Sequence, residues 1–412
     1  MKQIFYCAAI ACAVATPVCG WCENQNDIAE LKKSIAELSG IVKSLQTTVK
    51  AQQVELSSLK KENQALAVAQ TKVVTERPSA TTLASGTSPK KGTYLPEIGM
   101  VADIVGTSSQ SSEDSEGNDR FSARDVELVI GHDVDPYSRL DATITFSDQE
   151  SASLEEAYAS FWDLPLDSKL RFGLIKPKIG IDAAIHRDSL DTVDEPLVIT
   201  TYLGKEGMNK TGFDLTAFTP LATDWFTQQL TLGFLDGGGG DDGQLFGTNE
   251  RYPTLYGKLK NSIDFSDESN ADIGLTWLNG NSTDDSQRNV NTLVVDATFS
   301  QHISPTSKFK LQNEAYINQE SSTWGYYSLA DYRLGERWAL GTRWDWVQPI
   351  DPIANSVKDY DQELSGYLTF FQSEFARWRF EYQHDWRQDD THDNVLFLQG
   401  TFAIGTHKHA LQ

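Results

Sequence analysis

The sequence predicts an all-β transmembrane barrel of about 16 antiparallel strands, preceded by an N-terminal α-helical coiled coil. One observation behind this fold class is the alternation of rings and charges in residues 378–387, where Trp378 and Phe380 are separated by Arg379 and followed by Glu381. Side chains alternate across a strand with a period of two, so the rings share one face and the charges share the other. A membrane barrel turns such rings toward lipid and such charges toward a water-filled lumen, whereas a soluble sandwich does the reverse.

The second observation is a series of strand-like segments that begins at Tyr94, separated by clusters of Gly, Pro, Asn, Asp and Ser. The expected strands are residues 98–105, 120–132, 137–148, 153–164, 166–175, 211–219, 225–235, 252–262, 271–278, 289–302, 307–319, 323–334, 336–347, 360–371, 374–387 and 393–406. Their number is even and within the range of single-chain outer-membrane barrels. Long polar connections fall mostly on one end of the strands, with 263–270 as a longer exception on the other. A soluble β fold has no reason to keep its long connections on one side, which favours the barrel.

The third observation is the N-terminal organisation. A basic start, an apolar run over residues 4–14 and small residues before Trp21 predict a secretory signal peptide. Residues 28–66 keep an unbroken heptad pattern, which predicts a coiled coil in the periplasm. Its β-branched a positions and leucine d positions favour a parallel dimer, while a barrel partner could impose three chains, so a homo-oligomer is expected with trimer favoured and dimer open. The expected divisions are 1–20 for the signal peptide, 24–70 for the coiled coil, 71–93 for a flexible linker and 94–412 for the barrel.

Composition excludes several classes of protein. The formal net charge is -23, which argues against a nucleic-acid partner because such a partner selects a basic surface. The mean hydropathy is -0.40, and no apolar run beyond the N-terminus approaches the roughly 20 residues of a membrane helix. All four cysteines lie at residues 7–22, so a disulfide-stapled body is not expected.

The connection over residues 176–210 stands out because it is long, lacks a strand pattern and is rich in Ile, Leu and Val. We expect it to fold into the barrel as a constriction loop, with an extracellular lid as the alternative. The charged loop residues expected to set ion preference are Lys176, Lys178, His186, Arg187, Asp188, Asp191, Asp194 and Glu195.

Basic residues on the charged faces of the strands are expected to line the channel opposite this loop. They are Arg139, Arg171, Lys308, Lys310, Arg337, Arg343, Arg377 and Arg379. Facing the acidic loop, they would set up a transverse field that attracts charged solutes. The alternative is simple pairing with lumenal carboxylates such as Asp141, Glu314, Asp345 and Glu381.

Motifs of catalysis are missing from the sequence. It has no Gly-x-Ser-x-Gly elbow, no His-Glu-x-x-His pair and no phosphate-binding glycine loop. We therefore expect no enzyme, no catalytic residue, no metal site and no cofactor.

The order of signal peptide, coiled coil, linker and barrel resembles the DcaP-type porins that carry a coiled coil. The stretches 95–99, 119–121, 131–136, 186–190 and 194–197 resemble the LbtU family of siderophore porins. The resemblance implies passage of anionic solutes, small carboxylates for one group and ferric siderophore for the other. The chain departs from such barrels at its C-terminus, where Phe402 is followed by ten further residues instead of closing the chain with an aromatic ring.

Together these features predict a porin of the Gram-negative outer membrane that contacts lipid and lipopolysaccharide. No plug domain is visible ahead of the barrel, so an energised TonB-dependent transporter is not expected. The alternative is a structural or adhesive envelope protein that its barrel only anchors.

Overall fold

The computed structural model describes residues 96–111, 119–148, 151–239, 243–247, 250–281, 289–354 and 356–405. They belong to one compact unit, residues 89–412. The expected signal peptide, coiled coil and linker, and the chain after residue 405, lie outside the described residues. Within the described residues, no helix is long and apolar enough to cross a membrane.

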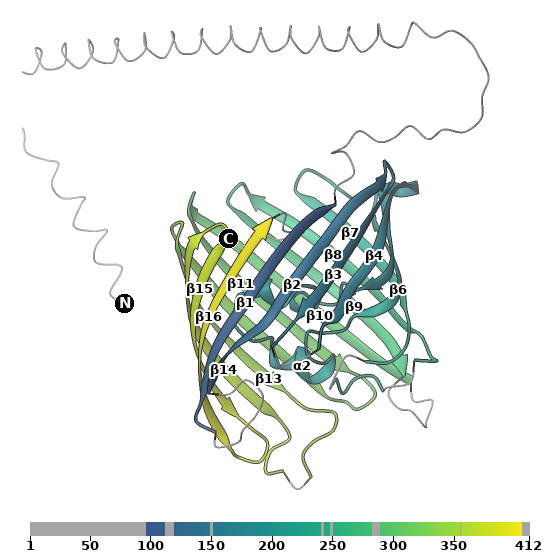
Figure 1. Cartoon of the computed structure of the whole chain (residues 1–412). Helices are drawn as coiled ribbons and strands as arrows, with labels where there is room; N and C mark the ends of the chain where they lie inside the picture. The colour runs from purple at the N-terminus through teal and green to yellow at the C-terminus, as the bar shows by residue number, and fades with distance from the viewer. Residues whose placement is uncertain are drawn as a thin grey trace, which may run out of the picture. The chain divides into compact units, whose positions relative to one another are not determined.

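The described residues form sixteen antiparallel strands that close into one barrel, in which each strand pairs with its neighbours in sequence and β16 returns to β1 (Figure 1). The strands are β1 (Glu97–Ser109), β2 (Arg120–Asp135), β3 (Ser138–Phe146), β4 (Ser153–Leu164), β5 (Ser168–Ile175), β6 (Lys210–Phe218), β7 (Phe226–Leu235), β8 (Thr254–Ser266), β9 (Ser269–Asn281), β10 (Asn289–Ser304), β11 (Ser307–Asn318), β12 (Trp324–Leu334), β13 (Trp338–Val347), β14 (Asp361–Ser373), β15 (Ala376–Trp386) and β16 (His392–Gly405). The closing pair is in register from Gly99 opposite Gly405 to Ser109 opposite Val395. The predicted barrel and its strand number are confirmed.

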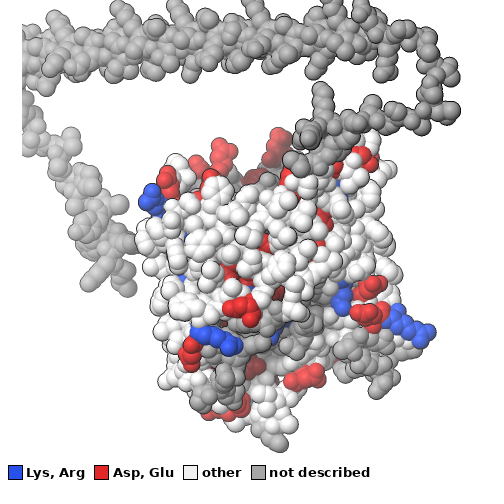
Figure 2. Space-filling model, viewed as in Figure 1, with Lys and Arg blue, Asp and Glu red and all other residues white. Residues whose placement is uncertain are grey.

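The alternation seen in the sequence becomes an outer apolar face and an inner polar face. In β15, Trp378 and Phe380 are 41% and 51% exposed, while Arg379 and Glu381 between and beyond them are 3% and 0% exposed. Most of the viewed face is uncharged, and the few charged side chains on it stand apart from one another or in small groups (Figure 2). Because apolar rings are stable on an outer surface only against lipid, this face is the one that a bilayer would cover.

Two expected connections differ from the structure. The stretch 263–270 is not a long connection, because β8 continues to Ser266 and β9 begins at Ser269. Ile263 and Phe265 keep the period-two pattern there, and Asp264 still pairs with Asn270 across the ladder. Strand β5 starts two residues later than expected, because a short 3-10 turn, η1 (Pro165–Asp167), occupies its predicted start.

Candidate functional site

The connection from β5 to β6, residues 176–209, folds against the inner face of the barrel. It contains two 3-10 turns, η2 (Asp182–Ala184) and η3 (Arg187–Ser189), and the helix α2 (Leu197–Tyr202), which lies within the outline of the barrel in Figure 1. Its apolar side chains are almost fully buried and pack with inward-facing rings of the wall. The core so formed includes Ile179, Val198, Ile199, Tyr202 and Leu203 from the loop, and Tyr256, Tyr316, Tyr327 and Val347 from the strands. The apolar residues noted in the sequence thus pack the loop against the inner wall of the barrel.

Arginines of the wall hold the loop by its backbone carbonyls. Arg379 donates to the carbonyl oxygens of Leu190 at 2.9 Å and Thr192 at 2.7 Å. Arg343 donates to the carbonyl oxygen of Asp194 at 2.6 Å. Further bonds run from Arg124 to Val193 and from Arg377 to Asp188. A guanidinium that bonds a carbonyl keeps its charge, so these contacts position the loop without neutralising the wall.

Carboxylates of the barrel wall also accept hydrogen bonds from backbone amides of the loop. The amide of Val193 donates to Glu381 at 2.7 Å, and that of Leu197 donates to Asp345 at 2.9 Å. The amide of Ile181 donates to Glu314 at 2.9 Å. Since these three carboxylates come from β15, β13 and β11, the loop is fixed to several strands along one side of the wall.

Gly180 is a point where the loop cannot carry a side chain. Its φ is +55°, and a Cβ there would collide with the carboxylate of Glu314. Its carbonyl oxygen also accepts a hydrogen bond from the Lys258 amine.

We expect Gly180→Ala to detach this part of the loop, measured as faster tryptic cleavage after Lys178. Gly335→Ala is the matched control, because Gly335 has φ +65° but nothing within 4 Å of the added carbon. Equal protection of the two variants would contradict the role of this close approach.

Several of the predicted channel-lining residues are neutralised by carboxylates. Arg343 is 0% exposed and lies 2.7 Å from Asp345 and 2.5 Å from Glu363. Arg171 pairs with Asp214, and Lys310 pairs with Asp191 of the loop. Arg139 lies 2.6 Å from Glu97, 3.0 Å from Asp141 and 3.6 Å from Asp133. These residues therefore form ion pairs with carboxylates, which is the alternative to an open row of positive charges.

Lys308 and Arg337 lie away from the loop. Lys308 is half-buried near the start of β11, opposite Arg333 of β12. Arg337 is exposed, because β13 begins only at Trp338 and leaves this residue in the preceding turn.

Arg377 and Arg379 differ from the other basic residues of the wall. Both are buried, and their side-chain partners are neutral: Thr401 for Arg377, and Thr369 and Gln399 for Arg379. In the described part of the chain, no carboxylate oxygen lies within 4.0 Å of either guanidinium. Both guanidinium groups therefore face the loop from β15 without a close ion pair, and acidic groups such as Asp191 of the loop act on them from a longer distance.

The cationic loop residues make both local and cross-barrel contacts. The Lys178 amine donates to Thr216 at 2.9 Å, and burial lowers its pKa to about 8. Lys176 donates to the carbonyl oxygen of Glu206 at 2.6 Å. Arg187 lies 3.2 Å from Asp125 of β2 and 3.3 Å from Glu206.

The acidic loop residues take part in the same network. Glu195 accepts the amide of Glu206 at 2.8 Å, and Asp194 lies 3.7 Å from Arg124. Asp188 is buried and accepts a hydrogen bond from Ser189. The structure thus brings all the predicted loop residues to the inner wall.

His186 meets three carboxylates that the sequence analysis did not select. Its Nδ1 lies 3.0 Å from Glu155 and 3.6 Å from Glu127, and its Nε2 lies 3.2 Å from Glu156. Burial opposes a positive charge on the ring, yet these carboxylates raise the pKa of His186 to about 10. Glu155 and Glu156 both face inward because the pairing of β3 with β4 shifts register between Thr143 and Ile144. A bulge of this kind leaves no mark in the sequence.

Two further connections close over α2. Gln244 and Leu245, in the connection from β7 to β8, donate their amides to the carbonyl oxygens of Thr201 and Tyr202, both at 2.9 Å. The side-chain oxygen of Gln244 accepts the amide of Ile350, in the connection from β13 to β14, at 2.8 Å. Three connections therefore interlock at the same end of the barrel.

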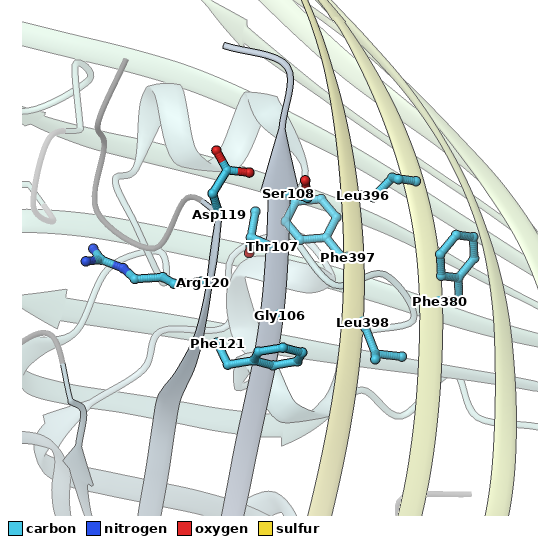
Figure 3. A pocket seen from close by; sticks show the side chains of 10 residues that line it. All are labelled: Gly106, Thr107, Ser108, Asp119, Arg120, Phe121, Phe380, Leu396, Phe397 and Leu398. Carbon is cyan, nitrogen blue, oxygen red and sulfur yellow. The ribbon is translucent and has the colours of Figure 1, made fainter. Parts of the chain in front are cut away.

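A groove of about 310 Å³ lies outside this network. Its lining includes Phe121, Phe380, Leu396 and Leu398, which point outward from β2, β15 and β16 (Figure 3). Because these side chains belong to the apolar outer face, the groove belongs to the lipid-facing surface and is no part of a solute path.

No protein-family model matches the chain. An uncharacterized protein of Aquifex aeolicus (strain VF5) is 25% identical over 377 residues, covering 76% of this chain and 79% of its own. Among solved structures, OprB of Pseudomonas putida superposes with a TM-score of 0.52 at 9% identity, covering 75% of this chain and 94% of that one. The anion-selective porin of Comamonas acidovorans gives 0.51 at 10% identity, covering 75% and 99%. The outer membrane channel DcaP of Acinetobacter baumannii gives 0.50 at 13% identity, covering 75% and 96%.

The fold is porin-like. At these identities the likenesses establish the closed sixteen-stranded barrel and not the solute.

Proposed function

We propose that the protein is a channel of the Gram-negative outer membrane that passes small anionic solutes, with the loop over residues 176–209 as its constriction. The apolar outer face supports the membrane location, because a closed barrel is one of the few structures that satisfies its backbone within lipid. The observation that carries the anion preference is the pair Arg377 and Arg379, neither of which has a carboxylate oxygen within 4.0 Å in the described residues. Positive charge beside a constriction raises the local concentration of anions.

The anion preference is tested by the double variant Arg377→Gln and Arg379→Gln. We expect its anion-to-cation permeability ratio to fall severalfold, measured as the zero-current potential across a planar bilayer with a KCl gradient. Arg139→Gln is the matched control, because its charge is already compensated by Glu97, Asp133 and Asp141. An unchanged potential in a double variant that still folds as a barrel would refute the role of this pair.

The packing of the connections at one end of the barrel bears on the size of solute that can pass. The three interlocked connections support a narrow passage, which favours small carboxylates over ferric siderophore, the larger solute that the LbtU resemblance implies. Vesicles containing the protein should swell in a small dicarboxylate and exclude ferric siderophore. Uptake of the siderophore at a comparable rate would overturn this size limit.

Assembly and the rival function are tested on the same purified protein. We propose a homo-oligomer, trimer before dimer, held partly by the coiled coil over residues 24–70 in the periplasm, with lipopolysaccharide around the barrel. Analytical ultracentrifugation with and without residues 24–70 measures that contribution.

The rival function is tested by conductance in planar bilayers. A protein that conducts no ions in any salt would instead be a structural or adhesive envelope protein.

A further inference from the structure

The strongest unassigned feature is the cluster around His186 at the junction of the loop with β2 and β4. One ligand atom each from Glu127, Glu155 and His186 lies within 4.8 Å of the others, and all three residues are buried. Two carboxylates and an imidazole are a ligand set that divalent transition metals accept. No metal site is expected from the sequence, because these residues are distant in the chain.

The hydrogen bonds of this cluster are incomplete. Nδ1 of His186 carries at most one proton, and Glu155 at 3.0 Å is the better placed acceptor for it. Glu127, only 5% exposed, lies at 3.6 Å from the same nitrogen, beyond hydrogen-bond distance. Within the described residues, no other side chain or amide is placed to donate to Glu127. Glu127 is therefore left with its ion pair to His186 and with any water or cation that reaches its oxygens.

A metal ion would satisfy all three groups at once. Ligands about 2.1 Å from a zinc ion lie roughly 3 to 3.5 Å from one another, and the two distances from Nδ1, 3.0 and 3.6 Å, are close to this spacing. All three ligand atoms lie within 4.8 Å of one another, so a small approach of the two carboxylates completes the set. The opposite ring nitrogen, Nε2, faces Glu156 at 3.2 Å. In metal sites a carboxylate at that position orients the imidazole and raises its basicity. Thr145 occupies the other oxygen of Glu155, which leaves the oxygen nearest Nδ1 for a metal.

We propose that Glu127, Glu155 and His186 bind one divalent first-row transition-metal ion, with Zn²⁺ as the probe, and that Glu156 positions the imidazole. Binding releases the proton of Nδ1 to solvent. The ion would join the loop, through His186, to β2 and β4, and so add a fixed point beside the contacts that Arg124 and Asp125 of β2 already make with the loop. This inference concerns how the loop is held and does not depend on which solute passes.

The test is calorimetric titration of the full chain with ZnCl₂ after treatment with EDTA and alkylation of the cysteines. We expect one Zn²⁺ per chain, and an affinity at least about 10-fold weaker in Glu127→Gln and in His186→Gln. Glu336→Gln and His302→Gln are matched controls, because both residues are exposed and lie away from the cluster. Absence of binding to the wild type, or equal affinity in all variants, would overturn the proposal and leave His186 as a protonated partner of its carboxylates.

A second measurement needs no variant. X-ray absorption at the zinc edge of the loaded wild type should show a shell of nitrogen and oxygen atoms with the scattering of one imidazole. A spectrum without imidazole scattering would overturn the site even if the variants failed to fold.

Discussion

Deleting residues 182–198 is expected to raise the single-channel conductance severalfold. The segment includes η2, η3 and the start of α2, and it carries most of the carbonyls and amides that the wall holds. Without it, water refills the space, and wall arginines such as Arg343 and Arg379 become hydrated instead of buried. The strands keep their own ladders, so the barrel is expected to fold. Conductance is measured in planar bilayers, and the exclusion of polyethylene glycols of increasing size reports the new diameter.

The control for this deletion removes Asp389 and Asp390 from the connection between β15 and β16. These residues are exposed, and the connection lies at the same end of the barrel as the loop. The conductance of this control variant should stay near that of the wild type. A folded barrel that lacks residues 182–198 and conducts like the wild type would show that the constriction lies elsewhere.

The barrel was predictable because each strand carries its own alternating pattern of apolar and polar residues. Each strand must alternate between lipid and interior, so β15 could be expected at 374–387 from its rings and charges, and the structure places it at Ala376–Trp386. Turns were harder to predict, because a tight turn such as the one after Ser266 is built from ordinary polar residues that equally suit a longer connection.

The inward loop was predictable only in part. Its length and apolar content indicated burial, but the partners of its backbone could not be predicted. Arg379 and Thr192, for example, are 187 positions apart in sequence, and they meet only because the sheet closes on itself. His186 and Glu127 likewise meet only because the loop folds back against β2. In addition, the bulge that turns Glu155 and Glu156 to the same side breaks the period-two rule by which inward-facing residues of a strand are predicted.

Replacing Arg343 is expected to have the largest effect on stability of any single substitution considered. Its guanidinium is fully buried, pairs with Asp345 and Glu363, and also donates to Thr192 and to the carbonyl oxygen of Asp194. Arg343→Met leaves two buried carboxylates without their counter-ion. Removing one partner of a buried pair costs about 3–5 kcal/mol, because the remaining charge is desolvated and uncompensated. Urea unfolding in lipid vesicles, followed by tryptophan fluorescence, measures the loss.

Two further variants distinguish the cost of leaving a buried carboxylate unpaired from the cost of losing an arginine side chain. Arg139 also faces three carboxylates, but it is 26% exposed, so water compensates those charges and Arg139→Met should cost far less. Adding Glu363→Gln to Arg343→Met should recover part of the loss, since one uncompensated charge is then removed. Equal losses for Arg343→Met and Arg139→Met would show that the burial of the partner carboxylates does not set the cost, and would contradict this prediction.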